Sequence, residues 1–108
     1  NKKKSSMNDI QFTTFLADIQ PISLPFYLDI YNNKSYDFNA TKMISGEFVI
    51  EIDGYCCYNN YATDYNIVLN VLDNNSNYIE INTEQYKKLK KTVINNIVTN
   101  GSKYSKAI

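Results

Sequence analysis

The residues from Tyr55 to Tyr65 include the side chains best suited to recognising another molecule. Tyrosine supplies a large contact area at a low entropic cost, and asparagine forms adaptable hydrogen bonds. Half-buried tyrosines are also frequent in ordinary strands, so simple sheet packing is the alternative interpretation. The predicted partner-binding residues of this segment are Tyr55, Tyr58, Asn59, Asn60, Tyr61 and Asp64.

Three acidic residues extend this candidate surface towards the N-terminus. Glu47, Glu51 and Asp53 share one alternation, so on a strand they would lie on the same face of a sheet. No lysine lies between Met43 and Tyr86, and the middle of the chain is therefore acidic. Such a face either keeps an exposed sheet in solution or complements a basic partner.

The composition excludes several kinds of catalysis. The chain has no histidine, which removes histidine bases, histidine-activated nucleophiles and histidine-bound metals. Its three glycines are scattered, so no glycine-rich phosphate loop is present. Cys56 and Cys57 are adjacent and would point to opposite faces of a strand, which predicts two reduced thiols. We therefore expect no enzyme activity, no metal site and no cofactor.

One segment has a partial calcium-binding pattern. Asp73, Asn75, Asn77 and Glu84 fall at the first, third, fifth and twelfth places of a loop of the EF-hand type. The sixth place, which requires glycine, is Tyr78. The sequence therefore favours a plain hairpin turn over a calcium site.

Lysines are concentrated in the N-terminal tail and in one later segment. Lys87, Lys88 and Lys91 flank apolar positions at helical spacing and would face water in an amphipathic helix. Weak nucleic-acid binding through these three residues is the alternative. Arginine is absent and the formal net charge is zero, which argues against nucleic acid as the main partner.

Alternating apolar residues predict the strands that must position these side chains. The alternation is clearest over residues 21–31, where two prolines indicate an edge strand. It recurs over residues 47–52 and 65–72. Turn-forming residues over 73–77 predict a hairpin that leads into a further strand at 78–81.

The Asp53-Gly54 pair leaves two interpretations open. This dipeptide is typical of a two-residue hairpin turn. The apolar alternation also allows one long strand that continues to Tyr58. We favour the long strand.

Apolar residues at helical spacing predict two helices. The C-terminal helix begins after the capping pair Asn82 and Gln85, and Gly101 supplies a stop signal. Asn8 and Gln11 form a similar pair before an apolar stripe near the N-terminus. The threonines of that stripe would also suit a strand, so a helix or a strand is expected over residues 8–19.

These elements predict a single two-layer α+β domain. Its sheet has three to four mostly antiparallel strands, with the C-terminal amphipathic helix packed on it, and a second helix joins that layer if residues 8–19 are helical. Residues 1–7 are expected to form a flexible basic tail, residues 8–101 the domain and residues 102–108 a C-terminal tail. The sequence has no apolar stretch of membrane-spanning length and no signal-peptide pattern, so we expect a cytoplasmic protein without membrane contact.

The second half of the chain, over residues 47–98, resembles small accessory proteins encoded by tailed bacteriophages. The resemblance lies in the strand EFVIEIDGYCCY, the loop NNYATD, the strand YNIVLNVLD and the cap and helix of YIEINTEQYKKLKKTVINNI. It implies a phage or mobile-element origin. The abundance of lysine, asparagine, tyrosine and isoleucine, which have AT-rich codons, agrees with that origin.

The resemblance also implies a function. Phage proteins of this kind often bind and block a host protein, including CRISPR nucleases and other defence proteins. We expect a binding protein that inhibits such a host protein, which could itself be a nucleic-acid-binding effector. The alternative is a structural or assembly component of a phage particle, which would form homo-oligomers.

Overall fold

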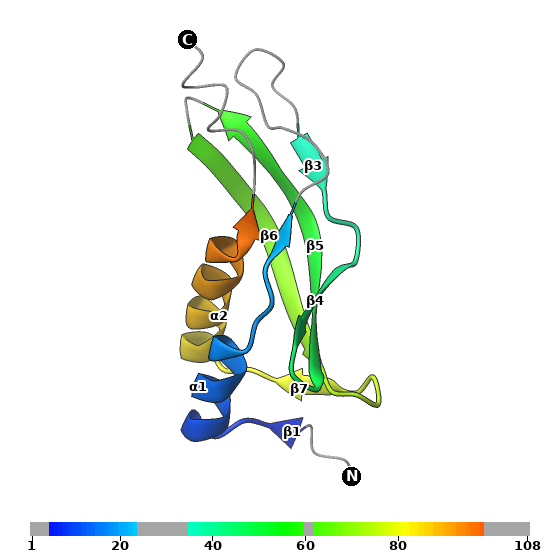
Figure 1. Ribbon diagram of the computed structural model, residues 1–108, viewed down its shortest axis with the longest axis vertical. Coiled ribbons are helices and arrows are strands. Elements are labelled where there is room, and N and C mark those ends of the chain that lie inside the picture. Colours follow the sequence, from blue (N-terminus) through cyan, green and yellow to red (C-terminus); the bar gives the residue numbers. More distant parts are fainter. Residues whose placement is uncertain (1–4, 24–34, 60–61, 99–108) are drawn as a thin grey trace.

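The structure of the chain is a computed structural model that describes residues 5–23, 35–59 and 62–98. Its two helices lie together on one side of a twisted sheet (Figure 1). The elements are β1 (Ser5–Ser6), α1 (Asp9–Ala17), β2 (Ile22–Ser23), β3 (Ser35–Asp37), β4 (Thr41–Ser45), β5 (Phe48–Asn59), β6 (Ala62–Leu72), β7 (Tyr78–Glu80), α2 (Thr83–Asn95) and β8 (Ile97–Val98).

The main sheet has six strands, in the order β1-β7-β6-β5-β3, with β4 also paired to β5. All neighbours are antiparallel except β1 and β7. A second, two-stranded parallel sheet joins β2 to β8. The α+β class is confirmed, but the expected three or four strands were too few because the sequence signals of β1, β3 and β4 are weak and short.

The long strands follow the predicted alternation. β5 continues through Asp53-Gly54 to Asn59, so the long-strand interpretation is confirmed and no hairpin turn forms at this dipeptide. Tyr78 pairs with Leu72, which confirms the hairpin between β6 and β7. The strand predicted over residues 21–31 begins as β2, and its remainder lies outside the described residues.

Both helices begin with the predicted capping box. The Asn8 side chain accepts from the Gln11 N–H, and the Gln11 side chain accepts from the Asn8 N–H. Asn82 and Gln85 form the same pair before α2. The N-terminal segment is therefore a helix, and the strand alternative for residues 8–19 is wrong.

Two expected boundaries were misplaced. The tail predicted over residues 1–7 is too long, because Ser5–Ser6 pairs with β7 and Met7 is buried. The helix stop expected at Gly101 comes too late, because α2 ends at Asn95 and the next residues form β8. In both cases pairing with a distant strand overrides the local signal.

The core lies between the helices and the inner face of the sheet. It contains Met43, Ile50, Ile52, Leu69, Val71, Leu89 and Val93, together with Phe12 and Phe15 of α1. The buried Ser45 hydroxyl donates to the Phe15 carbonyl at 2.6 Å, which ties β4 to α1. Both described helices cover this inner face. No described element covers the other face of the sheet.

The sheet edge formed by β3 and β4 is interrupted by a short excursion opposite Asp53-Gly54. Asn39 and Ala40 have positive φ angles of 47° and 63°. The Asp53 carboxylate accepts from the Ala40 N–H at 2.9 Å, and the Phe38 N–H donates to the Gly54 carbonyl at 2.8 Å. Asp53 therefore stabilises the turn that separates the two short strands.

We predict that Ala40→Gly stabilises the protein. Alanine in the left-handed region costs about 1 kcal/mol relative to glycine, and the freer unfolded chain of the glycine variant offsets part of that gain. The expected increase in the free energy of unfolding is about 0.5 kcal/mol, measured by urea denaturation. Destabilisation by Ala40→Gly would contradict the strain at this position.

Candidate functional site

The candidate site is the outer face of the sheet, opposite the helices. Side chains that alternate with the buried residues of β3, β4, β5, β6 and β7 point to this side, which we call the open sheet face. Residues paired across neighbouring strands lie side by side on it. Its composition can therefore be derived row by row from the strand register.

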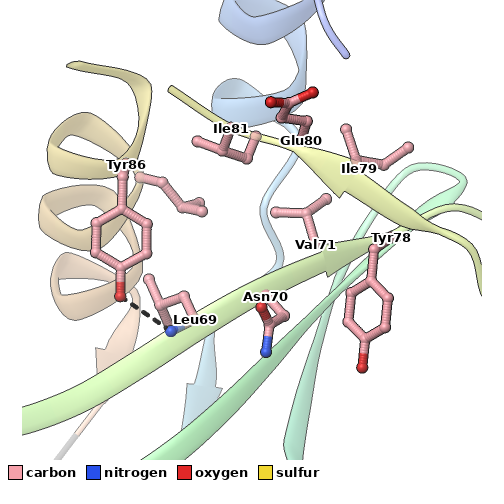
Figure 2. Close-up of a pocket in the computed structure, with 9 residues that line it drawn as sticks. Leu69, Asn70, Val71, Tyr78, Ile79, Glu80, Ile81 and Tyr86 are labelled. Atoms are coloured by element: carbon pink, nitrogen blue, oxygen red, sulfur yellow. Dashed lines mark hydrogen bonds between the residues drawn. The ribbon is translucent and has the colours of Figure 1, made fainter. Parts of the chain in front are cut away.

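One row of the open sheet face is entirely apolar. Ile44 pairs with Val49, Val49 with Leu72, and Leu72 with Tyr78, so the row crosses four strands. Ile44 is 48% exposed and Tyr78 is 53% exposed. In Figure 2, Tyr78 and Asn70 extend to the side of the sheet away from α2.

The other rows mix acidic, polar and apolar groups. Lys42 pairs with Glu51 and Glu51 with Asn70; Asp53 pairs with Val68. Asp37 pairs with Tyr55 and Tyr55 with Asn66; Ser35 pairs with Cys57 and Cys57 with Asp64. Along the described strands β3 to β6, the acids Asp37, Glu51, Asp53 and Asp64 thus share this face with a single lysine, Lys42.

Large exposed apolar side chains are concentrated on this face. Six such side chains occur among the described residues, and four of them, Ile44, Tyr55, Val68 and Tyr78, belong to the open sheet face. Val68 has the largest exposed fraction of these four, at 60%. Exposed apolar groups gathered on one surface indicate an interaction site more strongly than the same groups scattered singly.

The structure brings together four of the predicted partner-binding residues. Glu51, Asp53, Tyr55 and Asp64 all lie on the open sheet face, within seven consecutive pairs of the β5–β6 register. The Asp53 carboxylate also accepts a hydrogen bond from the Ala40 N–H, so one of its oxygens already has a structural partner.

Glu47 does not belong to this surface. It lies with Gly46 in the two-residue turn that joins β4 to β5, because Ser45 already pairs with Phe48. Gly46 has a φ of 56°, the sign that a type II′ turn requires at its first central position. The expected acidic row of Glu47, Glu51 and Asp53 was therefore wrong at its first member.

Of the remaining predicted residues, two lie at the end of β5 that leads into the hairpin. Tyr58 and Asn59 end β5 and pair with Thr63 and Ala62 through their backbones. Asn60 and Tyr61 lie outside the described residues. Among the described residues, the candidate site is therefore centred on the strands.

The apolar part of the site was not predicted from the sequence. Val68 and Tyr78 fall at positions that the predicted alternation assigns to solvent, and Ile44 lies on β4, which was not predicted. An apolar residue at a solvent position of a strand is the signal that could have identified Val68 and Tyr78. Lys42 could not be placed, because β4 was not predicted.

The two thiols are free and lie on opposite sides of β5, as predicted. Cys56 is in the core, and burial raises the pKa of its thiol to about 11, with a further contribution from nearby Cys57. Cys57 is half-buried on the open sheet face. Burial also raises the pKa of Tyr65, which pairs with Cys56, to about 12.

These shifts predict a loss of stability at alkaline pH. Both groups bind their protons more tightly in the folded chain, so the unfolded chain loses protons first as the pH rises. The stabilisation from Cys56 is complete below pH 9 and lost towards pH 11; that from Tyr65 is lost between pH 10 and pH 12. Thermal unfolding from pH 8 to pH 11 should show a falling Tm, and Cys56→Ala should reduce the slope. An unchanged slope in that variant would contradict the assignment.

The partial calcium pattern is a hairpin turn. One Asp73 carboxylate oxygen accepts from the Asn75 and Asn77 N–H groups, each at 2.9 Å. These bonds lower the pKa of Asp73. Among the described residues no group of three or more acidic or cysteine side chains is placed to hold a metal ion.

The predicted nucleic-acid-binding lysines all lie on α2. Lys87, Lys88 and Lys91 are exposed. Lys87 and Lys91 line a surface hollow together with Lys90, whereas Lys88 does not. The structure thus separates the three lysines into two positions on the helix.

Comparison with known proteins gives no relative from which a function could be transferred: no family model, curated protein or solved structure matches the chain. Within the described ranges, neither helix is long and apolar enough to cross a membrane. The functional assignment therefore depends on the chemistry of the surface.

Proposed function

We propose that the chain is a non-catalytic protein-binding module that docks its open sheet face onto a basic surface of a partner protein. The observation that carries this proposal is the composition of that face, where four acids and one lysine surround four exposed apolar side chains. A solvated face of an antiparallel sheet is ordinarily polar. This one retains large apolar groups at a cost in solubility.

Each part of the face has a distinct role in the proposed complex. Tyr55, Val68 and Tyr78 act as anchors, because buried aromatic and aliphatic groups supply most of the energy of an interface. Glu51 and Asp64 steer the encounter and select a positively charged partner.

The partner fitted by this chemistry has lysine or arginine around apolar pockets. A nucleic-acid groove on a host defence protein has such a surface, and an acidic module placed there would block it. The phage-like order of elements over residues 47–98 and the AT-rich coding support the search for such a partner.

The proposal predicts that substitutions on the open sheet face weaken binding without unfolding the chain. Glu51→Lys with Val68→Ser should lower the affinity for the partner by about 100-fold, through a lost anchor and a reversed charge. The matched control is Glu84→Lys with Ile10→Ser, since both of these residues are exposed on the helices. The control should bind like the unaltered chain.

The measurement has two steps. A protein captured from the lysate of a low-GC bacterium is purified and then titrated against the unaltered chain, the open-face variant and the control, at low and high salt. Affinity that falls with salt and only in the open-face variant supports the proposal. Equal affinities for the two variants would overturn it.

A further inference from the structure

Among the described residues, one edge of the main sheet is unpaired along most of strand β6. On one side β6 pairs with β5 along their full shared length, from the pair Val49–Leu72 to the pair Asn59–Ala62. On its other side β7 pairs only with Val71 and Leu72. From residue 62 to residue 70 no described strand lies against this second side, which we call the free β6 edge.

The direction of one hydrogen bond shows which backbone groups of β6 face the free β6 edge. The Leu69 N–H donates to the Tyr86 hydroxyl of α2 at 3.1 Å and so points away from β5 (Figure 2). Alternate residues of an antiparallel strand point their N–H and C=O groups the same way. Thr63, Tyr65 and Ile67 therefore present a regular row of donors and acceptors at this edge.

The opposite edge of the sheet is protected by other segments, whereas no described strand protects the free β6 edge. On the β4 side, Ile19 bridges to Ser45, and the Gln20 N–H donates to the Ile44 carbonyl at 2.8 Å. β3 is short and is set off by the turn at Ala40. Proteins usually blunt exposed edges by prolines, lysines, bulges or covering segments. Residues 62–70 contain no proline or lysine, and their register with β5 is unbroken.

Helix α2 places three lysines, Lys87, Lys90 and Lys91, beside this edge. Tyr86, Lys90 and Ile94 repeat at a spacing of four residues, and Tyr86 itself touches the edge strand. The same three residues line a hollow of about 500 Å³, together with Lys87, Lys91 and Asn95. A second hollow of about 310 Å³ lies where β7 and α2 diverge from β6, at the end of the free edge (Figure 2).

Charge decides between the possible occupants of the edge. A second copy paired through its own β6 would place the two α2 helices next to each other on one side of the joined sheet. The lysines of the two α2 helices would then face one another, and this repulsion is unfavourable. An extended segment with acidic side chains towards α2 would instead neutralise Lys87, Lys90 and Lys91.

We propose that the free β6 edge binds an extended, acidic segment of another protein by β-strand addition. The segment completes the backbone hydrogen bonds of Thr63, Tyr65 and Ile67. Its side chains on the helix side alternate between apolar groups against Tyr86 and Ile94 and carboxylates against the lysines. This surface is separate from the open sheet face, so the inference does not depend on the proposed function.

The test uses amide hydrogen exchange of the full chain, observed by NMR. In the free chain the Tyr65 and Ile67 amides should exchange at least about tenfold faster than those of Asn66 and Val68, which bond to β5. The probe is a nine-residue peptide with threonine at odd positions and valine, glutamate, isoleucine and glutamate at even positions. Binding should slow the Tyr65 and Ile67 amides at least about tenfold.

Two sets of controls separate strand addition from adsorption. Two peptides are N-methylated at alternate residues, one at the residues whose N–H groups face β6 and the other at the residues whose N–H groups face away. Only the second peptide keeps the donors that β6 needs, so only that peptide should bind. Replacing both glutamates of the peptide by lysine should weaken binding at least about tenfold. Lys90→Glu with Lys91→Glu should do the same, whereas Lys88→Glu, on the same helix but outside the hollow, should not.

Three results would overturn the proposal. One is the absence of any slowing at about 1 mM peptide, a concentration at which even weak strand addition is visible. Another is equal binding of the two N-methylated peptides. The third is slowing of Tyr65 and Ile67 with rising protein concentration and no peptide, which would identify a second copy as the occupant.

Discussion

Gly54→Ala should lower the free energy of unfolding by about 4 kcal/mol, because the added methyl group brings both backbone strain and a steric clash. Gly54 has a φ of 109°, which side-chain-bearing residues rarely adopt. An added Cβ would lie 2.1 Å from the Asn66 carbonyl oxygen and 2.9 Å from the Ile67 Cα. Both atoms belong to the backbone of the paired strand, so neither can move without breaking the β5–β6 ladder.

Gly46→Ala is the matched control for this prediction. Gly46 also has a positive φ, 56°, but an added Cβ would meet nothing closer than an Asp18 carboxylate oxygen at 3.8 Å. Its expected cost is about 1 kcal/mol, from backbone strain alone. Urea denaturation followed by circular dichroism gives both values. Equal losses in the two variants would show that the close approach at Gly54 has no energetic weight.

The close approach at Gly54 also explains how far the sequence could predict β5. The alternation of Phe48, Ile50 and Ile52 identifies the buried face, because a strand with one buried face has a period of two. The dipeptide Asp53-Gly54 is a turn signal in isolation. Here the glycine allows the backbones of β5 and β6 to approach closely. This role can be recognised only once the register of β5 with β6 is known.

The helices were predictable for a different reason. Each begins with asparagine followed three residues later by glutamine, and each capping box is complete within four residues of sequence. Such local signals need no knowledge of the rest of the fold. β1, β3 and β8 have no local signal of comparable strength, since each is two or three residues long and exists because a distant strand lies beside it.

The candidate site was predictable in part for the same reason. Glu51, Asp53 and Tyr55 alternate along one predicted long strand, so their common face followed from the pattern, whereas Asp64 was expected in a loop and joins them only through its pairing with Cys57. The apolar row through Ile44 and Tyr78 depends on the pairing of four strands. The free β6 edge depends on where β7 stops, which no feature of the β6 sequence records.

Gln85→Glu should lower the free energy of unfolding by about 3 kcal/mol at neutral pH. Gln85 is buried, and its side chain has two tasks. The carbonyl oxygen accepts from the Asn82 N–H, and the amide nitrogen donates to the Met7 carbonyl at 3.1 Å. Glutamate keeps the first bond, but a carboxylate oxygen replaces the donor beside the Met7 carbonyl. The result is repulsion in a site that excludes water.

The pH dependence of this loss distinguishes repulsion from a simple packing defect. Burial beside a carbonyl oxygen favours the protonated acid, whose O–H can donate to Met7, so the pKa of the new carboxyl group should rise on folding. The deficit of the variant should therefore be small at acidic pH and grow as the pH rises through that raised pKa. Urea denaturation of the variant and the unaltered chain, each at acidic and neutral pH, measures it.

Gln11→Glu provides the control, because α1 has the same capping box in an exposed setting. Gln11 accepts from the Asn8 N–H at 3.1 Å, and the structure records no buried acceptor for its amide group. Glutamate can fill that role, and its charge is favourable near a helix N-terminus, so the free energy of unfolding should change by less than about 0.5 kcal/mol. A loss in Gln85→Glu that matches the control, or that does not vary with pH, would mean that the bond to Met7 does not hold the N-terminal strand against α2.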